Sequence, residues 1–258
     1  ENKKITRNEI SPLTKSLLQT NTIEDSRYHI TNKNNKYQHM KLLYLVVTVL
    51  FFSFYSSAQQ FVDKAEIEFE VNTNVKKNMS NNSWDEMMKE NLSELKTSFW
   101  TYSFANNKSL FKFNRWSEKT RIPKNQKDQD EEKSWYYDFN TNTMSSQKQV
   151  VGSSIVISDS IAPIEWKLTN ENREIAGYNC RKAVGKIFGD VYIFAFYTDD
   201  ITITGGPCSI NGLPGMILGL TIPRLYTSYI ATKINLTVTN PTEIKPITAK
   251  KMYSNLEF

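Results

Sequence analysis

The sequence predicts a mostly β protein built on a single curved antiparallel sheet or open half-barrel, with one helix packed on the concave face. Segments of alternating apolar and polar residues recur along the chain, and turns rich in Asn and Gly separate them. Phe, Trp and Tyr make up 12% of the residues. Aromatic and β-branched side chains suit a pleated, half-buried surface. A closed β-barrel is the alternative architecture.

Residues 1–39 predict no folded structure. They are polar, rich in Asn, Lys and Thr, and without sustained periodicity. Such a segment cannot bury enough apolar surface to offset the entropy lost on ordering. We interpret it as a leader that results from a start site assigned too far upstream of Met40.

Residues 40–58 have the pattern of a secretory signal peptide. Lys41 precedes a short apolar run, and small residues close the segment at Ala58. This order of basic residue, apolar core and small-residue exit is typical of a signal that is cleaved, here between Ala58 and Gln59. The apolar run is shorter than the roughly 20 residues of a spanning helix. An uncleaved signal anchor is the alternative.

The remaining residues, 59–258, suit one β domain. Export to the periplasm or to the outer membrane is expected, without a lipid anchor because no cysteine stands directly after the apolar run. The formal net charge of +5 comes mostly from the first 58 residues. Without them 24 Lys and Arg face 23 Asp and Glu, a net charge of +1 that offers no attraction to nucleic acid.

Both histidines, His29 and His39, precede the predicted β domain. That domain therefore lacks the base of Ser-His-Asp and Cys-His catalysis and the imidazole ligands of many zinc sites. No catalytic residue, metal site or cofactor is predicted.

The elements follow in order from hydrophobic periodicity. Alternation predicts a half-buried strand over Phe61–Val71, and apolar residues at helical spacing predict a helix over Trp84–Leu95. A hairpin joins Thr97–Ala105 to Ser109–Asn114 across an Asn-Asn turn. The charged segment 117–133 is expected to be a mobile surface loop, with a docking arm as the alternative.

The second half of the domain predicts further antiparallel strands. Val191–Thr198 is apolar on both faces and is therefore expected to be central. Asn170–Arg173 is expected to be a turn. The other expected strands are Trp135–Phe139, Met144–Val151, Trp166–Thr169, Ile175–Cys180, Cys180–Phe188 and Tyr226–Val238.

The segment Gly205–Leu220 combines turn dipeptides with a long apolar run. Its hexapeptide is Gly212-Leu213-Pro214-Gly215-Met216-Ile217. We expect a tight double turn, with positive φ at both glycines, that leads into a buried strand. These side chains are apolar or absent, so the predicted role is structural.

The hexapeptide GLPGMI resembles the signature of the GLPGLI family of exported proteins from Bacteroidetes-type bacteria. The segment WKLTNENREIAGYNCRKA, residues 166–183, is similar to another conserved run of that family. The resemblance implies an exported β protein and supplies no biochemical activity.

Two pairs of residues are candidates for a specific role, one pair for a disulfide bond and the other for catalysis. Cys180 and Cys208 are candidates for a disulfide, because exported proteins with an even number of cysteines commonly pair them. Two unpaired thiols are the alternative. Asp199 and Asp200 are the only plausible catalytic carboxylate pair near the hexapeptide. Neighbouring residues of a strand point to opposite faces, so both carboxylates cannot line one cleft, and a role in a turn or cap is favoured.

Two functional hypotheses remain. The first is a non-enzymatic periplasmic binding or accessory protein for an apolar ligand or an outer-membrane partner. The second is a carboxylate-dependent hydrolase that uses Asp199 and Asp200. The missing histidines and the separated carboxylates favour the first hypothesis.

Overall fold

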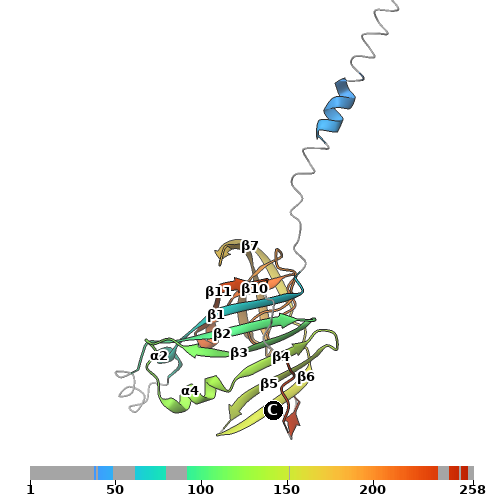
Figure 1. Ribbon diagram of the computed structural model, residues 1–258. Coiled ribbons are helices and arrows are strands. Elements are labelled where there is room, and N and C mark those ends of the chain that lie inside the picture. The colour runs from blue at the N-terminus through green and yellow to red at the C-terminus, as the bar shows by residue number, and fades with distance from the viewer. Residues whose placement is uncertain are drawn as a thin grey trace, which may run out of the picture. The chain divides into compact units, whose positions relative to one another are not determined.

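Twelve strands form one open sheet within the described part of the chain (Figure 1). The computed structural model describes residues 38, 40–48, 62–79, 92–150, 152–237, 244–249 and 251–254. The chain divides into two units, Glu1–Ala58 and Gln59–Phe258, and the sheet belongs to the second. The strand order is β12-β6-β5-β4-β3-β2-β1-β11-β10-β9-β8-β7. Because β12 and β7 are not paired, the sheet is not a closed barrel, and the predicted mostly β, open fold is confirmed.

The strands are β1 (Lys64–Asn74), β2 (Leu95–Ala105), β3 (Lys108–Trp116), β4 (Ser134–Asp138), β5 (Thr143–Val150), β6 (Ser153–Ser160), β7 (Trp166–Ile175), β8 (Tyr178–Ile187), β9 (Val191–Thr198), β10 (Met216–Ile222), β11 (Thr227–Asn235) and β12 (Met252–Tyr253). Among the described residues of this unit, the helices are α2 (Val75–Asn78), α4 (Lys124–Glu131) and the 3₁₀ turn η1 (Pro223–Leu225).

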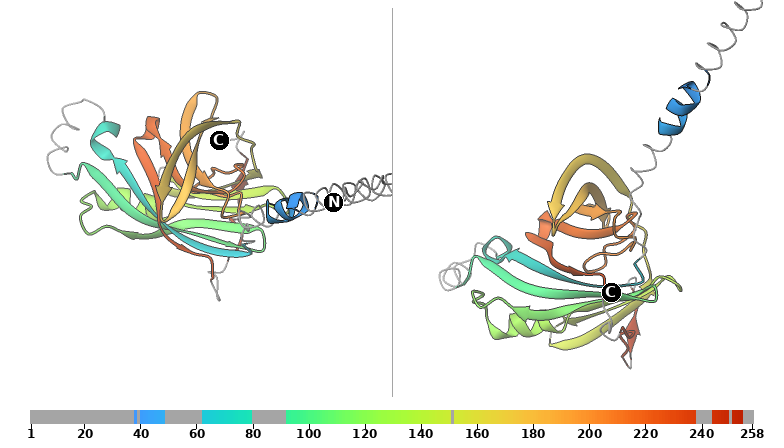
Figure 2. Two further views of the ribbon diagram at one scale, coloured as in Figure 1. Left: turned by 90° about the horizontal axis from the view of Figure 1, so that it is seen from above. Right: turned by 45° about the horizontal axis from the view of Figure 1, so that its top comes forward.

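All strand pairs are antiparallel except β12 with β6. The register shifts at four places, in the pairs β1–β11, β2–β3, β9–β10 and β7–β8. Irregularities of this kind bend a strand and increase its twist. The sheet is accordingly strongly curved, with β1 to β6 forming a trough and β7 to β10 arching over it (Figure 2).

Alternating apolar residues explain the core. On β1, Ala65, Ile67 and Phe69 are fully buried, whereas the residues between them are only half-buried. They pack with Trp100, Phe111 and other side chains in one apolar cluster. A second cluster joins β8, β9 and β10 to the segment before β10. The expected central position of β9 is confirmed, because it pairs with β8 and β10.

Several local predictions were wrong. The segment 117–133 contains the helix α4, which packs against β3 and β5. Asn170–Arg173 is not a turn but part of β7, an exposed edge strand with a bulge. The turn lies at Ala176–Gly177, where both residues have positive φ. The strands β6 and β12 were not expected from the sequence.

Other predictions fall partly or wholly outside the described residues. The helix expected over Trp84–Leu95 is not described up to residue 91, and Leu95 begins β2. The predicted cleavage site, Ala58–Gln59, also lies outside, so cleavage and export stay predictions. Residues 40–48 are helical. No helix in the described ranges has both the length and the apolar character needed to cross a membrane.

Candidate functional site

The segment between β9 and β10 crosses the concave face of the sheet. Cys208 of this segment shares a pocket with residues of β1 to β5 and β11, whereas Ser209–Asn211 share a second pocket with β4, β5 and the β8–β9 turn. Residues of distant strands can share a pocket with this segment only because the sheet curves around it. The segment therefore separates two pockets on the concave face.

Backbone geometry holds this segment in place. Gly212 and Gly215 have φ of +89° and +152°, as expected from the sequence. The amide of Ile217 donates to the carbonyl of Gly205 at 2.9 Å. Trp166 donates its indole N–H to the carbonyl of Asn211 at 3.0 Å. The last two residues of the hexapeptide begin β10, in which every residue except the half-buried Thr221 is buried.

The pocket on the Cys208 side is called here the Asp130 pocket. It has a volume of about 340 Å³, which lies at the lower end of the range for small-molecule sites. Its main lining side chains are Lys96, Trp100, Phe111, Asp130, Lys133, Trp135, Lys148 and Tyr229.

Aromatic side chains form the floor of the Asp130 pocket. Trp100 stacks on Phe111 with ring centroids 5.3 Å apart. Trp135 lies at 5.8 Å from Trp100, and Tyr229 at 6.4 Å from Phe111. Trp100 and Phe111 are buried, whereas Trp135 and Tyr229 remain half-buried at the pocket surface. The buried pair thus supports the accessible pair.

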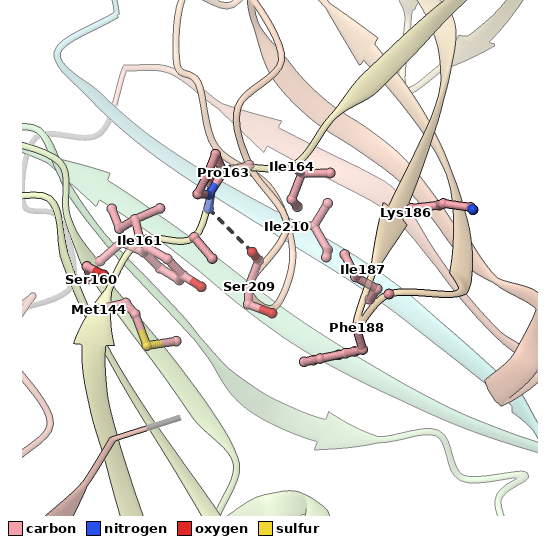
Figure 3. Close-up of a pocket in the computed structure, with 14 residues that line it drawn as sticks. Met144, Ser160, Ile161, Pro163, Ile164, Lys186, Ile187, Phe188, Ser209 and Ile210 are labelled. Atoms are coloured by element: carbon pink, nitrogen blue, oxygen red, sulfur yellow. Dashed lines mark hydrogen bonds between the residues drawn. The ribbon is translucent and has the colours of Figure 1, made fainter. Parts of the chain in front are cut away.

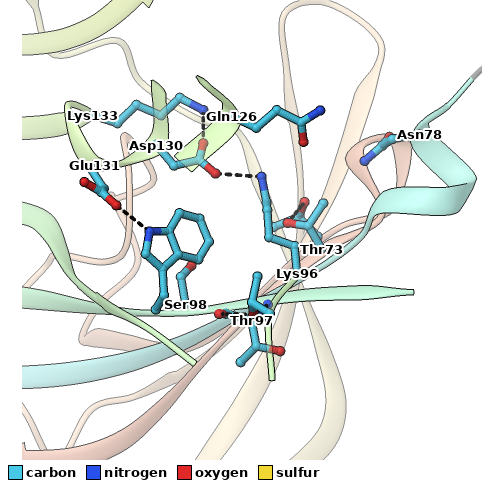
Figure 4. A network of polar contacts seen from close by, with 12 residues as sticks. Thr73, Asn78, Lys96, Thr97, Ser98, Gln126, Asp130, Glu131 and Lys133 are labelled. Carbon is cyan, nitrogen blue, oxygen red and sulfur yellow. Dashed lines mark hydrogen bonds and ion pairs between the residues drawn. The ribbon is translucent and has the colours of Figure 1, made fainter. Parts of the chain in front are cut away.

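A Lys-Asp-Lys cluster forms one wall of this pocket (Figure 4). The two carboxylate oxygens of Asp130 accept from Lys96 at 2.6 Å and from Lys133 at 2.7 Å. Burial raises the pKa of the Asp130 carboxyl, but Lys133 and Lys96 together lower it by more, so the pKa lies below its usual value. Asp130 therefore stays ionised at neutral pH.

The acidic residues that follow Asp130 are engaged away from the pocket. Glu131 accepts the indole N–H of Trp116 at 2.6 Å. Glu132 accepts from the side-chain amide of Gln149 at 3.4 Å. Neither residue lines the pocket. Among the described lining residues, Asp130 is thus the only carboxylate.

The second pocket lies between the β8–β9 turn and the segment that joins β6 to β7 (Figure 3). It is lined mostly by apolar side chains, including Met144, Ile161 and Ile210, and it also has a volume of about 340 Å³. Phe188, at the tip of the turn, is 86% exposed. No described residue in its lining carries a carboxylate.

The structure does not bring the predicted carboxylate pair into a pocket. Asp199 and Asp200 are exposed at the end of β9. The Thr198 hydroxyl donates to the Asp200 carboxylate at 3.3 Å. Both aspartates are thus turn residues at the sheet margin, away from the linings of both pockets.

The two cysteines are free thiols, so the candidate Cys180–Cys208 disulfide is absent from the structure. Cys180 is fully buried in the larger apolar cluster, and Cys208 packs against the same cluster. Burial raises the pKa of Cys180 to about 11 and that of Cys208 to about 12. Within the described residues, no group of His, Cys, Asp and Glu side chains could hold a metal ion.

Sequence reasoning missed the Asp130 pocket. Asp130 lies in a run of charged residues that looks like solvated surface. One indication of structure was present, because Pro123 precedes residues of good helix propensity. The partner Lys96 lies 34 residues earlier and could not be identified from local pattern.

The chain is an open, mostly antiparallel β domain with an aromatic and charged pocket. The sequence model described as "N-glycanase peptide, N-terminal domain", of PNGase F-II, matches residues 82–257. The chain therefore belongs to this family of PNGase F-II N-terminal domains.

Two solved structures of PNGF-II, in the C2 and P21 space groups, are similar to the chain. Each is 18% identical, with a TM-score of 0.44. The matches cover 74% and 75% of this chain but 31% of each PNGF-II chain. The chain thus spans about a third of the length of these structures. Comparison with curated proteins found no match.

The family match overturns two interpretations. The assignment to the GLPGLI family was wrong, because the family model that matches residues 82–257 is that of the PNGase F-II N-terminal domain. The non-enzymatic binding or accessory function was also wrong, and the match favours the hydrolase alternative. The missing histidines were weak grounds against a hydrolase, because glycoside hydrolysis can proceed with carboxylates alone.

Proposed function

We propose that this chain is a domain of a hydrolase that acts on N-linked glycans and that it binds the glycan part of the substrate. The match of residues 82–257 to the N-glycanase N-terminal domain carries this proposal. The Asp130 pocket supplies a site that suits the task.

The chemistry of the pocket favours a saccharide over a purely apolar ligand. Sugars present apolar C–H faces between their hydroxyl groups. Trp135 and Tyr229 offer half-buried aromatic surface, and large rigid aromatics of this kind give contact area at low entropic cost. Lys96, Asp130 and Lys133 offer hydrogen-bonding groups next to that surface.

Substrate binding fits the pocket better than bond cleavage does. A glycoside hydrolase normally needs two carboxyl groups flanking the reacting bond. The described lining of the Asp130 pocket holds one, and both of its oxygens already accept from lysines. Asp130 is therefore a positioning residue for the two ammonium groups.

Calorimetric titration with a glycopeptide tests the proposal. The chain should bind an N-glycosylated peptide more tightly than the same peptide without its glycan. Trp135→Ala should weaken the binding by about tenfold, the loss expected for one aromatic contact. Tyr192→Ala is the control, because Tyr192 is 53% exposed and lies outside the pocket. Equal affinity for both peptides would contradict glycan binding.

Glycan release tests the hydrolase part. Mass spectrometry should detect the free glycan when the naturally produced protein is incubated with the glycopeptide. Trp135→Ala should lower the rate at low substrate concentration, by raising KM. No release from any N-glycopeptide would contradict the assignment to a glycan hydrolase.

A further inference from the structure

The Asp130 pocket carries more positive than negative charge. Lys96 and Lys133 line it together with the carboxylate of Asp130, so two positive charges face one negative charge. Asp130 compensates one ammonium group only. These three side chains therefore have a net charge of +1.

The two lysines that contact Asp130 are partly buried, which strengthens their attraction for an anion. The side chain of Lys96 is 21% exposed and that of Lys133 is 37% exposed. Ammonium groups removed from water favour a nearby anion, because the solvation that stabilised them has been lost. The two neighbouring acids, Glu131 and Glu132, do not line the pocket and bond to Trp116 and Gln149.

The geometry leaves donors available for such an anion. An ammonium group has three N–H donors. Lys96 and Lys133 each use one of them on Asp130, at 2.6 and 2.7 Å. Both ammonium groups bond to the same carboxylate, in the pocket that the aromatic side chains also line. An anion between them would receive charge-assisted hydrogen bonds from two sides.

We propose that the Asp130 pocket recognises an acidic sugar, whose carboxylate pairs with Lys96 and Lys133 while its ring packs on Trp135 and Tyr229. This inference rests on the proposed glycan function and names the substrate class: glycans that contain a sugar acid. A neutral sugar would leave one of the two positive charges uncompensated, because Asp130 supplies a single negative charge, and this difference is the basis of the discrimination.

Binding of defined disaccharides tests the inference. A disaccharide ending in glucuronic acid should bind the chain more than about tenfold more tightly than the same disaccharide ending in glucose, the discrimination expected for charge-assisted hydrogen bonds. Raising the salt concentration should weaken the binding of the acidic disaccharide and leave the binding of the neutral disaccharide nearly unchanged. Inorganic phosphate serves as the probe for an anion without a sugar ring.

Matched variants locate the effect. Lys96→Gln and Lys133→Gln should each abolish most of the preference for the acidic disaccharide. Lys182→Gln is the control: its side chain is also 21% exposed and ion-paired, with Glu171, but it lies on β8 outside the pocket. Circular dichroism spectra and melting curves establish that each variant is folded.

The outcomes separate this inference from the proposed function. Equal affinity for the acidic and the neutral disaccharide, unchanged in Lys96→Gln, would overturn the acidic-sugar assignment and leave glycan binding intact. Phosphate bound as tightly as the acidic disaccharide would also overturn it, since the ring would then contribute nothing. Failure of every glycan, including the glycopeptide, would reject the proposed function itself.

Discussion

The main chain at Gly205 packs directly against the hydroxyl group of Tyr102. A Cβ atom at Gly205 would overlap that hydroxyl and lie 2.9 Å from the ring carbon Cζ. Tyr102 is 1% exposed, and its hydroxyl forms no hydrogen bond with the described residues. This contact joins β2 to the segment between β9 and β10, so it sets how closely that segment approaches the concave face.

We expect Gly205→Ala to destabilise the protein by about 1–3 kcal/mol, the usual cost of overpacking a core. Tyr102→Phe should be neutral or slightly stabilising, because it removes a buried hydroxyl without a partner. In the double variant, Gly205→Ala should lower the free energy of unfolding by less than it does in the wild-type background. The difference, which is the coupling energy, should be about 0.5–3 kcal/mol. Denaturant unfolding of all four proteins measures this coupling, and strictly additive effects would contradict the contact.

Much of the sheet could be predicted because its determinants are local. Alternation marked β1, and the adjacent asparagines Asn106 and Asn107 marked the β2–β3 turn, where both have positive φ. Asparagine tolerates this conformation better than most residues, so the turn follows from two positions alone. The fold class depends mostly on such local signals.

The predictions were wrong where contacts between residues distant in sequence determine the local structure. The polar residues Asn170–Arg173 resemble a turn, yet an edge strand with one solvent-facing side accepts them. Asp130 resembles surface charge, but it is 7% exposed because Lys96 and Lys133 neutralise it. A short stretch of sequence shows neither the position of a strand at the sheet edge nor the contact between residues 96 and 130. The candidate site was therefore less predictable than the sheet around it.

Gly215 provides a second test of backbone geometry. Its φ is +152°, and a Cβ there would overlap the carbonyl oxygen of Thr198. We expect Gly215→Val to cost more than about 3 kcal/mol, because a branched side chain meets rigid main chain. Thermal unfolding measures the loss, and glycan binding should disappear only together with the fold.

The control for Gly215→Val is Gly177→Ala. Gly177 also has a positive φ, +84°, but a Cβ there would meet nothing within 4 Å. The expected cost is about 1–2 kcal/mol from the left-handed backbone alone. A Gly215→Val protein with an unchanged Tm would show that the Thr198 contact does not constrain this turn.

The two thiols should resist alkylation in the folded protein. Burial raises the pKa of Cys180 to about 11 and that of Cys208 to about 12, so almost no thiolate exists at neutral pH. The thiolate is the reactive form. Iodoacetamide should modify both residues only after unfolding. A linked pair of peptides in a non-reducing map would contradict two free thiols.

The Asp130 carboxyl should contribute to stability in a pH-dependent way. Its pKa in the folded protein is lower than that of an ordinary aspartate, which is about 3.9. A lowered pKa means that the folded state binds fewer protons, so the contribution is fully present above the unfolded pKa. It is lost as the pH falls from about 4 through the folded pKa. Asp130→Asn should therefore lower Tm at neutral pH, and the difference from wild type should shrink below about pH 4.

Asp199→Asn provides the matched control for this titration. Asp199 is exposed at the end of β9 and outside both pockets, so its replacement should leave the melting curve nearly unchanged from pH 7 to pH 3. If the Asp130→Asn difference in Tm stayed constant over the same range, the ionised carboxylate would not be its source. The Lys96 and Lys133 contacts would then stabilise the fold through packing of their methylene chains, which does not depend on the charge of Asp130.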